Sequence, residues 1–407
     1  MEIITSLRNG KLTEIILIII VFMSLFFVFK NEKIQDPVWF VPYLSGAENL
    51  SNDGVWRYSE EELHEIRNSD DKNIICDYEF KKYPKEKLSV NKYNAIGYLY
   101  IVKLASVLFG CLPMVKAVQA FQVFLHLLMS FIIYFLFKNR NSKLLFLGLY
   151  LFNPIIIYIS SFPFYYFYQV VPTFFIILLY KKRMPLYIIY FAFAVIGFML
   201  NVRMTMLFAA ILASVLLFKN YKFKFSFFAI FIMVFSFCIT RSSQTATSRW
   251  HTTYVGIGAY SNEYLSKLSD ESGVELYELK TNKKIVPALQ RSKEYIGEYN
   301  NICKKEYFRI LRERPFLIFK NSVLNILQSY SIGHLANRGI FVNLLSAILG
   351  LFIILWLLFK RKYWLVISIG LLSATFTPYF PPIQQYMFGS YLLIVVAIID
   401  SFKFKDL

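Results

Sequence analysis

The sequence predicts an all-α, polytopic membrane protein with about ten spans and two large extracytoplasmic loops that carry interfacial helices. Three observations lead to this fold class. Hydrophobic residues make up 57% of the 407 residues and charged residues only 17%, which is too apolar for an ordinary soluble domain. Several apolar runs approach the roughly 20 residues that a helix needs to cross a bilayer. Lysine and arginine gather in short segments between these runs, as they do in cytoplasmic loops.

The basic segments set the order of the expected spans. They lie at 138–143, 181–183, 219–224, 360–362 and 403–405. The first apolar run, 15–29, is followed by no small-residue cleavage site and is expected to be a retained span, not a signal peptide. Placing every basic segment in the cytoplasm predicts spans at 13–30, 116–137, 144–160, 163–180, 185–201, 204–219, 224–240, 340–359, 363–380 and 384–402.

These spans divide the chain into three parts. We expect a membrane core at 1–240 with a first outer loop at 31–115, a second outer loop at 241–339, and C-terminal spans at 340–407. Two apolar stretches, 95–112 and 316–335, would break the charge alternation and contain Lys103 and Lys320. Both are expected to lie on the outer membrane face. The run KKEYFRILRER (304–314) is either an interfacial helix against anionic headgroups or a solvated amphipathic helix.

The net charge of +18 does not indicate a nucleic-acid partner, because the basic residues follow the membrane-orienting pattern. The four cysteines lack metal-ligand spacing. Cys76 and Cys303 fall in the two outer loops, where they either pair or remain two free thiols; the second alternative is favoured. His126 and His334 are assigned no role.

Acidic residues concentrate in the two outer loops. Thirteen of the 26 lie in 31–95 and nine in 241–316, and none lies between Ile96 and Thr240. A proton relay of carboxylates through the membrane therefore has little support, and most loop acids are expected only to solvate the loops. If carboxylates act chemically, they act outside.

Asp36 stands apart because it lies six residues past Lys30, at the mouth of the first span. A charge there is costly to desolvate, so it is either well solvated or functional. Pro37 suits a first helical turn, and Tyr43 and Ala47 would then share one face. Asp36 is thus a helix N-cap or a catalytic base, and spacing alone slightly favours the cap.

Other residues have two interpretations each. Arg203, at the outer end of an expected span, either extends to the headgroups or holds an anion. Trp250 either stacks on a ligand or belongs to an interfacial aromatic belt. Asp270 either binds a substrate or caps a helix, with the cap favoured. The aromatic run FPFYYFY (162–168) lines a groove for a lipid tail or, as favoured, faces lipid.

The order of several motifs resembles the GT-C glycosyltransferases, which are multi-span enzymes that take a sugar from a polyprenyl-phosphate carrier. Asp36, Tyr43, Ala47, Leu50 and Gly54 match the start of such enzymes in order. Further similar segments are YNAIGYLYIVKLASVLFG (93–110), NPIIIYISSFPFYYFYQ (153–169), GFMLNVRMTMLF (197–208) and SRWHTTYVGIGAYSN (248–262). Many relatives carry an acid near residue 165, and this chain does not.

The resemblance implies a function and a set of roles. It implies a bacterial plasma-membrane enzyme, similar to protein mannosyltransferases and aminoarabinose transferases, that moves a sugar with inversion from a polyprenyl phosphate to an extracytoplasmic glycan or lipid-linked acceptor. Asp36 would be the base. The donor phosphate would be bound by Arg203, Arg241 and His251, and the sugars by Tyr43, Trp250 and Asp270. No metal or other cofactor is indicated.

Two other classes remain open. An O-antigen-type polymerase or ligase would use the same lipid-linked sugars and outer-loop arginines, but would leave Asp36 unexplained. A lipid or polysaccharide flippase should show polar residues along central spans or internal repeats. An assembly subunit without activity is a further alternative.

Overall fold

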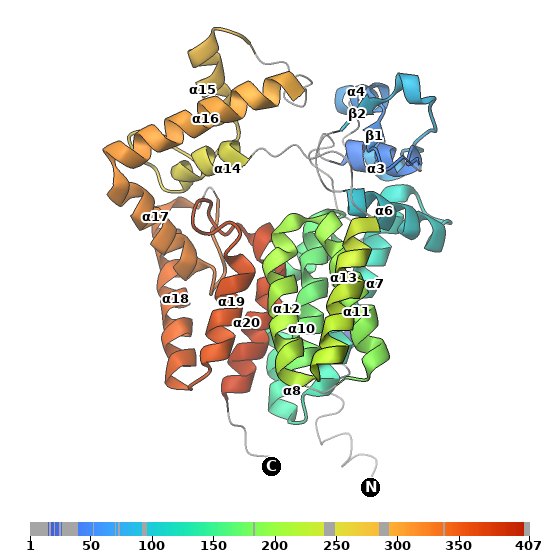
Figure 1. The fold of residues 1–407 in the computed structure, drawn as a ribbon, viewed down its shortest axis with the longest axis vertical. Helices are drawn as coiled ribbons and strands as arrows, with labels where there is room; N and C mark the ends of the chain where they lie inside the picture. The colour runs from blue at the N-terminus through green and yellow to red at the C-terminus, as the bar shows by residue number, and fades with distance from the viewer. Residues whose placement is uncertain are drawn as a thin grey trace.

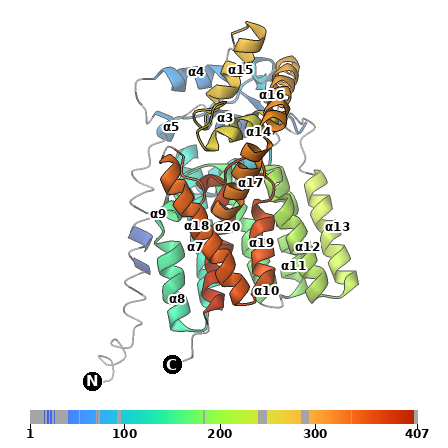
Figure 2. The ribbon, with the colours of Figure 1, turned by 90° about the vertical axis from the view of Figure 1, so that its left-hand side faces the viewer.

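A computed structural model of the chain shows a helical bundle with two smaller units at one end (Figures 1 and 2). It describes residues 40–51, 53–69, 71, 74–91, 96–181, 184–239, 249–284, 293–336 and 338–402, with a few positions between 15 and 26. The end of the bundle that carries the two units is called the cap end below.

The bundle contains two groups of helices that are far apart in sequence. The first group consists of α7 (Met114–Leu136), α8 (Arg140–Phe146), the π-helical turn η4 (Leu147–Leu151), α9 (Pro154–Ser161), η5 (Tyr165–Gln169), α10 (Val170–Lys181), α11 (Leu186–Val202), η6 (Met204–Met206), α12 (Leu207–Asn220) and α13 (Phe223–Ile239). The second consists of α17 (Pro315–Gln328), α18 (Gly339–Phe359), α19 (Tyr363–Ser373), η9 (Gln384–Met387) and α20 (Phe388–Ser401).

Two units cover the cap end. The first contains α3 (Val41–Glu48), β1 (Arg57–Tyr58), α4 (Glu60–Asn68), α5 (Ile74–Asp77), η3 (Lys85–Lys87), β2 (Ser89–Val90) and α6 (Ile96–Leu108), with β1 and β2 antiparallel. The second contains α14 (Arg249–Val255), η7 (Gly256–Ala259), α15 (Glu271–Thr281) and α16 (Lys293–Glu313), and has its own hydrophobic core. Residues from the two long loops therefore lie at the same end of the bundle (Figure 1).

The structure is consistent with a membrane protein, but it identifies fewer candidate spans than the ten that the sequence predicts. Among the described residues, α7 and α18 are long and apolar enough to cross a membrane. The segment from Arg140 to Leu151 together with α9 would make a third span, bent by 59°. The outer surface agrees with lipid contact, because α13 exposes a stripe of phenylalanines at helical spacing: Phe223, Phe227, Phe231 and Phe235.

Several boundaries differ from the expectation. Helix α19 ends at Ser373 and is followed by turns, so the helix does not continue to residue 380. Helix α3 begins at Val41, with Phe40 as its N-cap, whereas the helix start expected at Pro37 with Asp36 as its cap lies outside the described residues. Both helix ends lie near prolines and loop ends, where apolar composition alone does not locate a helix end.

Two apolar helices next to the bundle have unusual faces. Helix α6 buries Leu99 and Val102 but exposes Val107 by 72%, as an interfacial helix would. Helix α17 has the reverse of the usual polarity of a surface helix, because its phenylalanines are exposed on one face and its carboxamide side chains are buried on the other. It does not lie flat on the bundle end, because Leu327 reaches Gly350 in the middle of α18, where a Cβ would come within 1.8 Å of the Leu327 carbonyl oxygen. None of the four cysteines, all of which lie in the described residues, forms a disulfide.

Candidate functional site

Arg203 lies at the cap end, where α11 stops. Its backbone is extended and its amide donates to the carbonyl of Met199 at 3.0 Å. The run that follows turns through η6 into α12, so the side chain projects between helices and not along one. Its Nε donates to the Thr205 hydroxyl at 3.1 Å.

Three tyrosine rings surround the Arg203 guanidinium. Its central carbon lies 4.8 Å from the ring centre of Tyr165, 4.4 Å from that of Tyr166 and 4.6 Å from that of Tyr386. The first two rings belong to η5 and the third to η9, so short 3₁₀ turns from both halves of the bundle build what we call the Arg203 box. Each ring contributes about 0.5–2 kcal/mol of cation–π attraction.

The charge of Arg203 has no acidic counterpart in the described part of the chain. No carboxylate there lies within ion-pair distance of it. A guanidinium has five N–H donors. Thr205 takes one, and the hydroxyls of Tyr166 and Tyr386 interact with it as well. Two donors remain, so the box is suited to an anion that accepts two hydrogen bonds.

A second arginine lies near this box. Arg249, at the start of α14, is exposed. Both Arg249 and Arg203 lie close enough to the hydroxyl of Tyr379 to act on it electrostatically. The backbone of Gly256 in η7 also packs closely against Tyr379, because a Cβ at Gly256 would lie only 2.2 Å from the Tyr379 carbonyl oxygen. The second cap unit therefore brings another positive charge toward the mouth of the bundle.

Tyr43 connects the first cap unit to the box. It is 8% exposed and lies in α3. Its ring centre is 4.6 Å from that of Trp56, 5.2 Å from Tyr98 and 5.5 Å from Tyr165. Because Tyr165 also contacts Arg203, Tyr43 links α3 to the box. Tyr43 itself is packed and presents little surface to a sugar.

His251 and Asp270 contact each other within the second cap unit, where His251 is not available to bind a donor phosphate. His251 Nε2 is 3.2 Å from the Asp270 carboxylate, and its Nδ1 is 2.5 Å from the Tyr299 hydroxyl. The hydrogen bond from His251 holds the pKa of Asp270 below its usual value. Gly273 allows this packing, because a Cβ there would come within 2.3 Å of the Tyr299 hydroxyl. The trio joins α14, α15 and α16.

The other candidates divide into packed and undescribed residues. Asp270 occupies the N-cap position of α15, although its side chain makes no capping hydrogen bond there and lies 3.2 Å from His251 Nε2 instead. Trp250 packs against Phe308 at 5.4 Å, with the Lys304 ammonium 5.5 Å from its ring centre. Asp36 and Arg241 lie outside the described residues. In the described ranges, no three metal-ligating side chains gather.

The sequence did not reveal the tyrosine box. The run FPFYYFY was expected to face lipid, but Phe164, Phe167 and Tyr168 are buried, and the tyrosines between them enclose Arg203. A lone arginine in an apolar run, next to a run of tyrosines in another span, was the available signal. Tyr386 lies 220 residues from Tyr166 and had no signal of its own.

Comparisons of the chain with models of protein families, with curated proteins and with solved structures found no match.

Proposed function

We propose that the chain is a membrane glycosyltransferase that takes a sugar from a polyprenyl phosphate and transfers it to a glycan or lipid-linked acceptor outside the cytoplasm. The observation that carries the proposal is the Arg203 box at the cap end of the bundle. The Arg203 guanidinium has no carboxylate partner among the residues that the structure describes, and three tyrosine rings surround it. A lipid phosphate entering from the bilayer supplies the missing negative charge.

The reaction assigns one task to each group. The acceptor hydroxyl oxygen attacks the anomeric carbon, and the bond from that carbon to the phosphate oxygen breaks with inversion. Asp36 takes the hydroxyl proton as base. Arg203 binds the phosphate, on which negative charge grows as it leaves.

Two of the roles inferred from the resemblance change. His251 has both ring nitrogens engaged by Asp270 and Tyr299, so we assign it to holding the second cap unit together. Arg249 is near enough to Tyr379 to act on it electrostatically, as Arg203 does, and we assign it as the second phosphate cation in place of His251. The ten-span arrangement, with the cap end outside the cell, is part of the same proposal.

A transfer assay tests the proposal. Purified protein is incubated with synthetic polyprenyl-phosphate sugars and candidate cell-envelope glycans, and wild type is compared with Asp36→Asn. We expect transfer by wild type and a loss of at least about 100-fold in the variant, the usual range for removal of a general base. Undiminished transfer by Asp36→Asn removes Asp36 as base, and transfer from a nucleotide sugar alone removes the lipid donor.

One observation favours flipping of a lipid-linked sugar as a second candidate. Helix α7 buries Gln119, Gln122, His126 and Ser130 on one face, and both polar side-chain atoms of Gln119 and both nitrogens of His126 have no hydrogen-bond partner in the described structure. Buried unpaired polar groups are costly in a membrane. Translocation of a fluorescent lipid-linked sugar in vesicles, lost in Gln119→Leu, would support this candidate over transfer.

A further inference from the structure

The outward face of α16 is basic and hollowed. Lys304, Lys305, Phe308 and Arg312 are exposed and lie three or four residues apart or adjacent, so they share one side of the helix. The opposite side is apolar and buried in the core of the second cap unit. The basic side borders an open surface space of ≈ 740 Å³ that is lined by residues of α16 alone, and we call this space the basic hollow.

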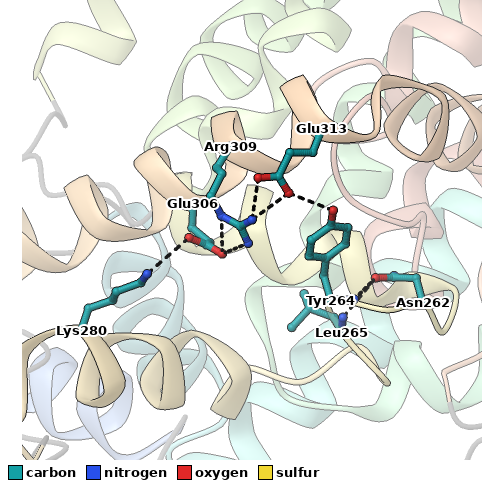
Figure 3. Close-up of polar contacts among 7 residues, drawn as sticks. All are labelled: Asn262, Tyr264, Leu265, Lys280, Glu306, Arg309 and Glu313. Carbon is teal, nitrogen blue, oxygen red and sulfur yellow. Dashed lines mark hydrogen bonds and ion pairs between the residues drawn. The ribbon is translucent and has the colours of Figure 1, made fainter.

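The charges in this hollow are only partly balanced. Arg309 is neutralised by Glu306 at 2.6 Å and Glu313 at 2.7 Å, and Lys280 also approaches Glu306 (Figure 3). Lys304, Lys305 and Arg312 have no acidic partner among the described residues. Three positive charges therefore remain unpaired around one hollow.

The end of α16 lies level with the start of a membrane-spanning helix. Leu327 of α17 contacts Gly350 of α18, and both helices run the same way from that contact back to their starts. Phe316 is 11 residues before Leu327 and Gly339 is 11 residues before Gly350, about 16 Å along either helix. Helix α16 ends at Glu313, just before α17, and crosses the end of the bundle (Figure 1).

This places the basic hollow at the height of the lipid headgroups. Phe316 and Phe319 of α17 are 74% and 64% exposed, as expected of side chains in contact with acyl chains. The headgroup layer is several ångströms thick, and a helix lying across it keeps its basic side within reach. The aromatic ring of Phe308, exposed by 37% among the cations, suits the boundary between headgroups and acyl chains.

We propose that the basic hollow of α16 is a binding site for the phosphate headgroup of an anionic phospholipid in the adjacent leaflet. The charge pattern supplies the attraction, at about fivefold in binding for each unpaired cation near the surface. This site is separate from the Arg203 box and does not depend on the proposed glycosyl transfer.

Lysine footprinting of the intact protein tests the site. The full chain is reconstituted in nanodiscs of phosphatidylcholine alone or of phosphatidylcholine with phosphatidylglycerol, and acetylation rates are measured by mass spectrometry. We expect phosphatidylglycerol to slow acetylation of Lys304 and Lys305 at least about threefold while Lys284, exposed and without an ion pair in the described structure, is unaffected. Equal rates in both discs, or equal protection of Lys284, overturn the proposal.

A further arm and one variant separate the alternatives. Inorganic phosphate added to phosphatidylcholine discs should not protect the two lysines; protection as strong as that by phosphatidylglycerol would make the hollow a site for free phosphate instead. Arg312→Gln should weaken lipid binding about fivefold and so return the acetylation rates of Lys304 and Lys305 most of the way to those in phosphatidylcholine, whereas Arg67→Gln, an equal charge loss on exposed α4, should not. Unchanged protection in Arg312→Gln contradicts the proposal.

Discussion

The Arg203 box should distinguish a lipid phosphate from the corresponding lipid alcohol, and Arg203→Gln should remove that distinction. Glutamine keeps a polar side chain of moderate length but loses the charge and the fork of donors. The three rings at 4.4–4.8 Å lose their cation, and the two donors left by Thr205 and the tyrosines disappear. The hydrophobic contacts of the lipid tail are unchanged, so only the phosphate contribution is affected.

The magnitude follows from the two remaining donors. A hydrogen bond to a charged group contributes about 1.5–3 kcal/mol, and two imperfectly aligned ones contribute about 3 kcal/mol together. Losing about 3 kcal/mol weakens binding about 150-fold. At a ligand concentration of about 100 times the wild-type Kd, binding stabilises the folded protein by about 2.7 kcal/mol. The same concentration stabilises the variant by only about 0.3 kcal/mol.

Thermal unfolding in detergent measures this difference. Wild type and Arg203→Gln are each unfolded with polyprenyl phosphate and with the matching polyprenol. The quantity of interest is the extra stabilisation by the phosphate over the alcohol, and Arg67→Gln is the matched control. Retention of the full difference by Arg203→Gln would refute the assignment of the phosphate to the box.

Three further predictions concern the fold and the cap. Gly350→Ala should lower the free energy of unfolding by about 1–3 kcal/mol by overpacking against Leu327, whereas Gly297→Ala, with nothing within 4 Å of its Cβ, should not; equal effects in chemical denaturation would contradict the close packing. Burial raises the pKa of Glu62 above its usual 4.5, so the folded protein holds that proton more tightly than the unfolded chain and stability falls as pH rises through the window above 4.5. Glu62→Gln should lack this fall in stability. If the stabilities of the variant and the wild type change with pH in parallel, the pKa of Glu62 is not raised by folding. Tyr299→Phe should destabilise the protein by about 1 kcal/mol through loss of the bond to His251 without changing polyprenyl-phosphate affinity; weaker phosphate binding would return His251 to the donor site.

Helix positions were predictable from the sequence, but helix ends were not. Apolar runs between basic segments located α7, α11, α12, α13 and α18 within a few residues, because long apolar runs have few other stable conformations near a membrane. The start of α3 and the end of α19 depend on loops around Pro42 and Pro378. Composition contains no signal for such ends.

The site was predictable only where a residue was unusual in its own segment. Arg203 was identified because an isolated charge in an apolar run needs a reason. Its tyrosine partners come from η5 and η9, and their convergence depends on how the two halves of the bundle pack. The contact between His251 and Asp270 has the same character, since it joins the starts of two short helices across a loop. Such contacts are tertiary and leave no periodic pattern.

The central claim is that Arg203 holds the phosphate of a lipid-linked sugar. A cryo-EM structure of the protein in nanodiscs with bound polyprenyl phosphate tests it most directly. The account predicts phosphate oxygens about 2.7–2.9 Å from the Arg203 guanidinium nitrogens, with the lipid tail leaving toward the bilayer. A phosphate located elsewhere in the protein, with the Arg203 box empty or filled by a protein carboxylate, would contradict it.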